Sequence, residues 1–416
     1  MRILLLVLSI LPLFFACQSQ AHRETASDTA PSVLAAESSA TILPGAYQTD
    51  EYLPLLQGKN VAMVVNHTSL IHETHLVDSL LASDVAVKQI FAPEHGFRGE
   101  AGAGDLIKDG TDPATGLPIF SLHGTHKKPT PEQLQGIDLV VFDIQDVGAR
   151  FYTYISTMHY VMEACAEQGK AMLILDRPNP NGYYIGGPVR QPGLQSFLGM
   201  HPIPIVHGLT VGELAGMING EGWLTDSAQC EAQVIPVQNY THSDRYHVPV
   251  RPSPNLPNDQ AINLYASLCL LEGTAVTLGR GTDFPFQVYG HPNKAFAEAT
   301  AEADTFTFVP KAIPGVVKYP KHENQRCYGS DLRDAERLDQ FTLKYVLKAH
   351  EEARAGGISN QDFFLTETFR ILAGTDALQQ QIIDGLSEEE IKQSWEPELS
   401  EYKEMRKQYL LYEDFE

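Results

Sequence analysis

Polar and charged residues follow a series of short apolar runs in the first half of the chain. Five such runs are followed by Asn66-His67, Pro93-Glu94-His95, Gln145-Asp146, Asp176-Arg177 and His207-Gly208. Carboxylates, imidazoles and guanidinium groups can transfer protons and hold polar ligands. In open α/β sheets, ligands bind outside the carboxyl ends of the strands. The repeated order of apolar run and polar residue therefore predicts a pocket built by successive strand ends.

The apolar runs have the composition of strands that are covered on both faces. Near-continuous Val, Ile and Leu residues predict strands at 60–65, 85–91, 138–144, 171–175 and 203–206. Between them, the spacing of apolar residues predicts helices over 74–83 and 153–168. Alternation of strands and helices predicts an α/β fold with a mainly parallel sheet.

The character of the chain changes near residue 250, after the Pro-rich stretch 252–255. Acidic helical stretches follow at 258–272, 340–355, 376–384 and 388–394, the last of which starts with a capping box at Ser387 and Glu390. We therefore expect a catalytic domain over 44–250 and a smaller α+β domain over 251–416. The Gly-rich segment 271–283 resembles a site loop, and it is a candidate to close over the pocket.

The first residues are typical of an export signal. A basic residue precedes an apolar run within residues 1–16, and Cys17 follows, which predicts a lipoprotein signal peptide with lipid on Cys17. A plain secretory signal is the alternative. Residues 17–43 have the composition of a flexible tether. The expected location is outside the cytoplasm, on a membrane facing the periplasm or the cell surface, where nucleotide cofactors are not supplied, so no cofactor is expected.

Composition and missing motifs exclude several other functions. Lys and Arg number 30 against 52 Asp and Glu, a net charge of −22, so nucleic acid is a poor partner. The Gly-rich stretch 99–104 lacks the Gly-Lys-Ser/Thr of a phosphate-binding loop. The chain has no Gly-x-Ser-x-Gly elbow, no HExxH and no paired CxxC, so no metal is expected. The oligomeric state stays open.

Long strings in the sequence resemble one family, the exo-β-N-acetylmuramidases of the NamZ type, formerly a domain of unknown function. The strings are 65–69 (VNHTS), 91–99 (FAPEHGFRG), 142–154 (FDIQDVGARFYTY), 176–180 (DRPNP), 207–210 (HGLT), 272–274 (EGT) and 279–282 (GRGT). The resemblance implies a Rossmann-like domain, a smaller C-terminal domain and an active-site cleft between them. It also implies a peptidoglycan hydrolase that releases terminal N-acetylmuramic acid from the non-reducing ends of wall fragments, with muramyl saccharides as partners.

Glu94 is the first candidate for the acid that glycoside cleavage requires. It follows an apolar strand and Pro93, and Phe91 and Phe97 lie close enough in sequence to desolvate it and raise its pKa. A carboxylate that only binds substrate hydroxyls is the alternative.

The second catalytic group is not fixed by the sequence. Asp146 lies past a strand end and Asp143 within the strand, and both are candidates, as is Glu100. Glu213 is also a candidate, although its spacing from Thr210 predicts a capping box, which is a sufficient structural reason for its presence. Alternatively, the 2-acetamido oxygen of the substrate attacks, with an Asp to orient it.

A lactyl carboxylate distinguishes muramic acid from glucosamine, so a selective site should offer an Arg. Arg98, Arg150 and Arg177 lie in strand-end segments, and Arg280 lies in the Gly-rich segment. Candidate ligands for sugar hydroxyls are Asn66, His67, His95 and His207. Tyr152 and Tyr154 are candidates to stack on a sugar ring or to belong to the core.

Two other functions stay open from the sequence. One is a peptidoglycan-binding lipoprotein without turnover, because the second carboxylate is uncertain. The other is a cell-wall amidase or esterase, against which the missing nucleophile elbow counts.

Overall fold

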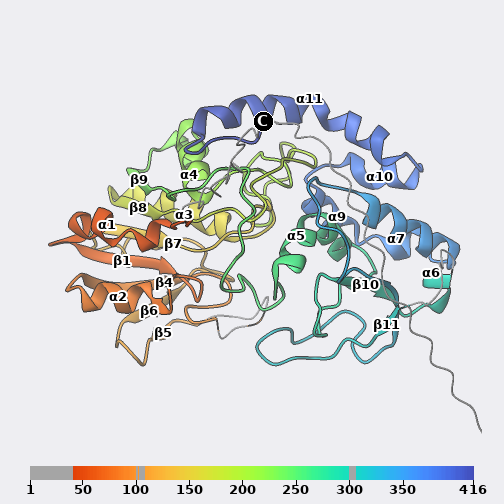
Figure 1. Cartoon of the computed structure of the whole chain (residues 1–416), viewed down its shortest axis with the longest axis horizontal. Coiled ribbons are helices and arrows are strands. Elements are labelled where there is room, and N and C mark those ends of the chain that lie inside the picture. The colour runs from red at the N-terminus through yellow and green to blue at the C-terminus, as the bar shows by residue number, and fades with distance from the viewer. Residues whose placement is uncertain (1–40, 100–101, 103–107, 299–305) are drawn as a thin grey trace, which may run out of the picture. The chain divides into compact units, whose positions relative to one another are not determined.

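A seven-stranded sheet forms the N-terminal part of the fold, in the order β5-β6-β4-β1-β7-β8-β9 (Figure 1). The strands are β1 (Asn60–Val65), β4 (Ala86–Ala92), β5 (Gly110–Thr111), β6 (Pro118–Ser121), β7 (Leu139–Asp143), β8 (Ala171–Leu175) and β9 (Ala232–Ile235). All neighbours pair parallel except β5 with β6. Without the edge strand β5, this is the strand order of a Rossmann fold, with its switch point between β1 and β7.

The computed structural model describes residues 41–416 apart from 100–101, 103–107 and 299–305. The predicted signal peptide, Cys17, Glu100 and nearly all of the predicted tether lie outside the described residues. Residues 41–416 form one unit by their contacts, so the boundary expected at residue 250 stays a prediction. In the described part, no helix has both the length and the apolar character needed to cross a membrane.

Alternate residues of each central strand face two different cores, as the two-residue period of a strand requires. Val61, Met63 and Val65 pack with α1 (Thr49–Leu56) and α2 (Leu76–Ala82). Ala62 and Val64 pack on the other face, in the core that contains α3 (Tyr154–Gln168) and α4 (Val211–Gly220). Helices thus cover both faces, which explains why the strands are apolar throughout.

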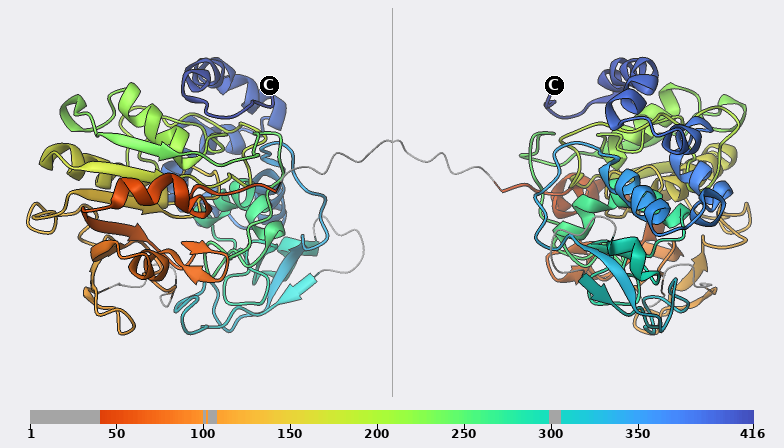
Figure 2. Two further views of the ribbon diagram at one scale, coloured as in Figure 1. Left: turned by 60° about the vertical axis from the view of Figure 1, so that its left-hand side comes forward. Right: turned by 90° about the vertical axis from the view of Figure 1, so that its right-hand side faces the viewer.

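The C-terminal region combines a small antiparallel sheet with helices (Figure 2, right). The sheet order is β10-β12-β11. The elements are α5 (Asp259–Leu268), β10 (Val288–His291), α6 (Lys294–Glu298), β11 (Phe306–Phe308), β12 (Cys327–Asp331), α7 (Lys344–Ala355), α8 (Asn360–Phe363), α9 (Thr366–Ala373), α10 (Ala377–Ile383) and α11 (Glu388–Arg406). Short elements complete the chain: β2 (Leu70–Ile71), β3 (Thr74–His75) and 3-10 turns at Gly45–Tyr47, Thr225–Ser227, Cys269–Gly273 and Lys407–Tyr409. Residues of α5, α7 and α9–α11 share one continuous core with α3 and α4, so the C-terminal region is anchored on one face of the large sheet.

Four of the five predicted strands are confirmed, whereas the strand predicted at 203–206 is wrong. Val206 forms only isolated bridges, with Ala149 and Gly186. Pro204 lies inside this apolar run, and proline has no N–H to donate to a sheet ladder. The strand that follows β8 in the sheet is β9, which is short and less apolar. Both predicted capping boxes are confirmed, at the first turns of α4 and α11.

Candidate active site

Side chains from both parts of the chain line one pocket around Glu94, as the expected cleft requires. The pocket has a cavity volume of about 130 Å³ and is open to solvent. Its walls are formed by Glu94, His95, Phe151, Tyr152, Thr153, Tyr154, Leu198, Ser253, Asn255, Leu256, Tyr265, Arg280 and Phe286. Of the predicted site residues, it brings together Glu94, His95 and Arg280, and it also contains Tyr152 and Tyr154, the candidates for stacking on a sugar ring.

Glu94 is positioned by the turn that ends β4. The turn includes His95 with φ 72° and Gly96 with φ 79°. A left-handed conformation is costly for a residue other than glycine, and such strain is concentrated at functional sites. The Glu94 side chain is half-buried, and Oγ1 of Thr153 donates a hydrogen bond of 3.0 Å to its Oε2. Thr153 directly precedes α3, so the strand end and the helix start together orient the carboxyl group.

Aromatic side chains form most of the apolar wall. The hydroxyls of Tyr152 and Tyr154 both donate to the carbonyl oxygen of Pro252, at 2.7 and 3.2 Å, and so attach the 252–256 loop to the start of α3. Burial, together with the charge of Glu94, raises the pKa of Tyr154. Both hydroxyls are therefore protonated donors at neutral pH.

Arg280 reaches the same pocket from the Gly-rich segment. Its Nε donates to Oε1 of Glu272 at 2.7 Å, and its guanidinium lies 4.9 Å from the centroid of the Phe286 ring. Gly279 and Gly281 flank it with φ 73° and 84°, and a Cβ at Gly281 would collide with a backbone carbonyl oxygen. Within the described residues, its Nη atoms make no hydrogen bond. The guanidinium is thus held by one edge, and the other edge is available to a ligand.

Asp143 and Arg177 are paired with each other away from this pocket. Nε and Nη2 of Arg177 contact the two oxygens of Asp143, the second at 2.9 Å, and Asp143 is fully buried. Arg177 also donates to the carbonyl oxygen of Leu70 at 3.2 Å. Because each side chain satisfies the other's charge, this geometry gives both a structural role in place of the predicted catalytic and substrate-binding roles.

Asp146 and His207 form a second buried pair. His207 Nε2 lies 3.9 Å from Oδ2 of Asp146, which accepts a 2.7 Å hydrogen bond from the Gly148 N–H. Oδ1 of Asp146 is buried without a hydrogen-bond partner in the described part of the chain. Burial raises the pKa of Asp146 to about 7 and lowers that of His207 to about 3. Neither side chain lines the pocket of Glu94, although the charge of Asp146 acts on Tyr152 and Tyr154 in its wall.

Arg150 and Arg98 form hydrogen bonds and ion pairs with other parts of the protein, so the prediction that they bind substrate is not supported. Arg150 is fully buried, and its guanidinium donates to four carbonyl oxygens, those of Pro188, Ile203, Leu372 and Ala373. It joins α9 to the loops of the N-terminal part. Arg98 forms a two-pronged pair with Asp112, at 3.1 and 2.9 Å, which lowers the pKa of that carboxyl group to about 2.

Asn66 and His67 also lie outside the residues that line the pocket. Oδ1 of Asn66 accepts from the N–H and the hydroxyl of Thr68 at 2.9 and 2.6 Å, which shapes the turn after β1. His67 Nε2 lies 2.9 Å from the carbonyl oxygen of Arg251, and burial lowers its pKa. Both residues link the end of β1 to neighbouring loops.

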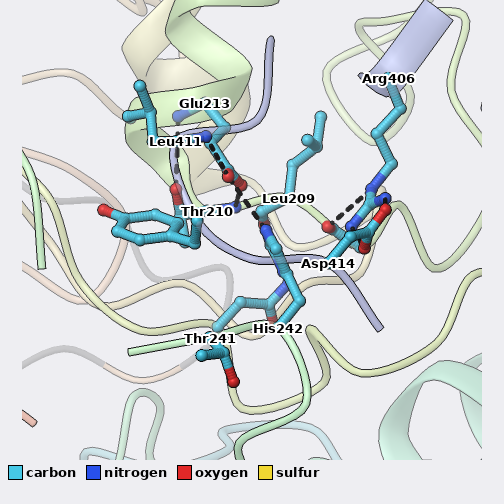
Figure 3. A network of polar contacts seen from close by, with 12 residues as sticks. Leu209, Thr210, Glu213, Thr241, His242, Arg406, Leu411 and Asp414 are labelled. Atoms are coloured by element: carbon cyan, nitrogen blue, oxygen red, sulfur yellow. Dashed lines mark hydrogen bonds and ion pairs between the residues drawn. The ribbon is translucent and has the colours of Figure 1, made fainter. Parts of the chain in front are cut away.

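Glu213 belongs to a structural network that fastens the C-terminus (Figure 3). Besides its capping box with Thr210, it lies 2.9 Å from His242 Nε2 and accepts the Leu411 N–H at 2.9 Å. Arg406 pairs with Asp414 at 2.7 Å in the same region. The structural interpretation of Glu213 is confirmed by these contacts.

Sequence reasoning missed several pocket residues, namely Phe151, Thr153, Leu198, Ser253, Asn255, Leu256, Tyr265 and Phe286. The stretch 252–255 predicted a break between domains, but Ser253 and Asn255 line the pocket, and Oδ1 of Asn255 is buried without a partner among the described residues. A loop of Pro, Ser and Asn between two elements is also typical of a binding loop. This composition could have identified 252–255 as part of the site.

Comparison with known proteins agrees with this architecture. Two family models match, "exo-beta-N-acetylmuramidase NamZ, N-terminal" over residues 61–260 and the corresponding C-terminal model over 263–412. A peptidoglycan beta-N-acetylmuramidase NamZ of Bacillus subtilis strain 168 is 37% identical over 390 residues, which are 89% of this chain and 90% of that protein.

Two crystal structures of DUF1343 family proteins from Bacteroides fragilis NCTC 9343 share the fold. One has a TM-score of 0.81 and 44% identity over 90% of this chain and 100% of that chain. The other has a TM-score of 0.76 and 28% identity over 89% and 99%. With both family models matched over nearly all of residues 61–412, the chain belongs to the exo-β-N-acetylmuramidase NamZ family.

Proposed function

We infer that this protein is an exo-β-N-acetylmuramidase, a glycoside hydrolase that releases terminal N-acetylmuramic acid from the non-reducing ends of peptidoglycan fragments. Family membership supports the activity. The single structural observation that carries the proposal is one pocket that holds a carboxyl group, Glu94, and a cation with a free edge, Arg280. The first can supply the acid that glycoside cleavage requires, and the second can recognise the lactyl carboxylate of a muramyl substrate.

Glu94 acts as the general acid in this proposal. It donates a proton to the glycosidic oxygen as the bond to the anomeric carbon breaks, so that the leaving sugar departs as a neutral alcohol. Thr153 Oγ1 holds the other carboxyl oxygen and so orients the proton. The aromatic wall excludes water from one side, which strengthens charge interactions in the pocket.

Among the described residues, Glu94 is the sole carboxylate that lines the pocket. Asp143 and Asp146, the other catalytic candidates, are buried outside it. This favours attack by the substrate's own 2-acetamido oxygen, which displaces the leaving sugar and forms an oxazolinium ion. Water then opens this ring at the anomeric carbon, so that the two inversions together retain the anomeric configuration. Glu100, outside the described residues, is the remaining carboxylate candidate. Proton NMR of the first product distinguishes retention, which is expected for attack by the acetamido oxygen or by a carboxylate, from inversion, which is expected for direct attack by water.

Arg280 provides recognition of the lactyl carboxylate. Its free edge can form a two-pronged pair with a carboxylate, the geometry for which guanidinium is best suited. Tyr152, Tyr154 and Asn255 are placed to contact sugar hydroxyls or the ring face, and His95 lies beside the acid.

We also propose that the chain is exported and tethered to a membrane through lipid on Cys17. The support is the sequence alone, an apolar run over residues 3–15 that ends at Ala16-Cys17, followed by a polar tether. Detergent phase partitioning of the full chain against Cys17→Ala tests this. A wild-type protein found in the aqueous phase would contradict it.

The activity is tested with purified protein and a disaccharide that carries N-acetylmuramic acid at its non-reducing end. Mass spectrometry should detect free N-acetylmuramic acid. Binding without release, even after long incubation, would favour a non-catalytic wall-binding protein. A product that lacks an acyl or peptide group, with the glycosidic bond intact, would show an amidase or esterase.

A further inference from the structure

Both tryptophans of the chain lie in a groove that the proposed reaction does not use. The groove consists of two adjoining hollows along α11, which share Val189, Gln191 and Glu398. The larger has a cavity volume of about 560 Å³ and includes Trp223, and the smaller has a cavity volume of about 110 Å³ and includes Trp395. The chain has 2 Trp in all. We call this surface the tryptophan groove and define it by Arg190, Gln191, Trp223, Trp395, Glu398 and Glu401.

The groove is separate from the pocket of Glu94, with which it shares no lining residue. It is formed by the 188–192 loop, the turn after α4 and the outer part of the C-terminal region. The helix α11 runs along the top of Figure 1, whereas β4 lies below the middle on the left of the same view. A ligand in the groove would therefore leave the catalytic pocket open.

Trp223 and Arg190 are held in place by the same residue, His201. The indole of Trp223 stacks on the His201 ring, with centroids 5.5 Å apart and planes at 29°. Nε of Arg190 donates to the carbonyl oxygen of His201 at 3.2 Å. An indole face and a guanidinium are thus positioned together by one buried support, and neither is a freely moving surface side chain.

Arg190 is buried, only 8% exposed, yet it has no carboxylate partner within salt-bridge distance among the described residues. Within the described residues, its Nε and Nη1 donate to the carbonyl oxygens of His201 and Gln191. Nη2 has no hydrogen bond in the described structure. In a chain of net charge −22, a desolvated guanidinium without a carboxylate is costly to maintain unless a ligand completes it.

The composition of the groove selects the class of ligand. The apolar C–H face of a pyranose ring packs against an indole face, whose quadrupole is negative. Planar polar side chains around the indoles, those of Arg190, Gln191, Glu398 and Glu401, can donate to and accept from ring hydroxyls and acetamide groups. A hydrocarbon ligand would leave these polar groups unsatisfied.

We propose that the tryptophan groove is a second saccharide-binding site, which holds the β-linked amino-sugar chain of peptidoglycan at a distance from the bond that is cleaved. This rests on the proposed function for the identity of the polymer. A site of this kind keeps the enzyme on insoluble wall material between cleavage events. It raises the local concentration of chain ends without contributing to the chemical step.

Tryptophan fluorescence provides the test, because every tryptophan of the protein lies in the groove. Glu94→Gln protein is titrated with peptide-free N-acetylglucosamine–N-acetylmuramic acid oligosaccharides. A saturable change in emission is expected, with Kd raised about tenfold or more in Trp223→Ala, roughly the loss of one stacked ring. Glu401→Gln, which changes an exposed side chain, should weaken binding less. Tyr319→Ala removes an exposed aromatic side chain elsewhere and should have no effect.

The activity readout distinguishes this site from the catalytic pocket. In the otherwise native protein, Trp223→Ala should raise KM on insoluble peptidoglycan severalfold, while kcat/KM on a small chromogenic muramide stays unchanged. Unchanged emission together with unchanged KM on the polymer would overturn the proposal, as would an equal response to a β-linked glucose oligomer. Failure of the wild-type protein to cleave the small muramide would instead reject the proposed function, and the fluorescence titration would still decide whether the groove binds saccharide.

Discussion

Two groups of polar residues follow strands of the same sheet, but one group borders an open pocket and the other is buried. Glu94, after β4, is half-buried in an open pocket that also holds Arg280. Asp143 and Asp146, at and after the end of β7, are buried with Arg177 and His207. Both groups satisfy the rule that places ligands at strand ends.

The difference lies in the partners of each group. Arg177 and Asp143 neutralise each other, so neither has capacity left for a substrate. Glu94 receives a hydrogen bond from Thr153 on one oxygen and borders open space. A position at a strand end therefore identifies candidate site residues. The ion pairs and hydrogen bonds that each side chain already makes decide which candidates can still bind or protonate a substrate.

The largest expected effect is on catalysis. Glu94→Gln keeps the shape of the side chain but cannot donate the proton. It should lower kcat/KM on a muramic-acid-terminated disaccharide about 10³-fold or more. The melting temperature should stay close to the wild-type value, because glutamine has the same size and shape and can still accept the hydrogen bond from Thr153. Wild-type activity in this variant would remove Glu94 from the mechanism.

The second prediction concerns stability. Asp143→Asn leaves Arg177 buried without its counter-charge and should cost about 3–5 kcal/mol in the free energy of unfolding. Denaturant titration measures this. The double variant Asp143→Leu, Arg177→Met is the control, because it removes both charges and should recover much of the loss. If Asp143→Asn is as stable as the wild type and lacks activity, Asp143 belongs to the catalytic group after all.

The third prediction concerns selectivity. Arg280→Ala should lower kcat/KM on muramyl substrates about 100-fold, roughly the value of a charge-assisted pair in a pocket. The same variant should cleave the corresponding N-acetylglucosaminide, which lacks the lactyl carboxylate, at the wild-type rate. Arg280→Lys should restore part of the muramyl activity. An equal loss on both substrates would mean that Arg280 only supports Glu272 and the pocket wall.

The smallest effect is a pH dependence of stability. Burial raises the pKa of Asp146 from its ordinary value of 3.8 to about 7, so the folded state binds this proton more tightly. The contribution is fully present below pH 3.8 and is lost as the pH rises through 7. Asp146→Asn should therefore raise the melting temperature at pH 8 by several degrees and at pH 4 by much less. A difference of the same size at both pH values would contradict the raised pKa.

His207 contributes with the opposite sign. Burial lowers its pKa from 6.5 to about 3, so it destabilises the folded state as the pH falls from 6.5 towards 3. For this reason the comparison with Asp146→Asn is made at each pH against the wild type, so that the His207 contribution largely cancels.

The sheet was predictable from the sequence because its strands are covered on both faces and therefore read as apolar runs. An apolar run also led to the wrong prediction of a strand at 203–206. There Pro204 interrupts the run, which packs as a loop. β9 was missed because a short outer strand needs fewer apolar residues.

The site was predictable only in part. Glu94, His95 and Arg280 share the pocket, and the expectation that the Gly-rich segment closes over the first part of the chain agrees with the position of Arg280. Arg150 could not be assigned, because its partners are carbonyl oxygens from segments as distant in sequence as Leu372. Every residue has a backbone carbonyl group, so the residue types in the sequence do not indicate which carbonyl oxygens will accept hydrogen bonds from an Arg.

The most direct test of the central claim compares leaving groups in Glu94→Gln. A general acid matters most when the leaving alcohol is poor and little when it leaves readily as an anion. The variant should lose about 10³-fold or more on the natural disaccharide but less than about tenfold in the bond-cleavage step on a 4-nitrophenyl muramide. An equally large loss on both substrates would contradict the assignment of Glu94 as proton donor.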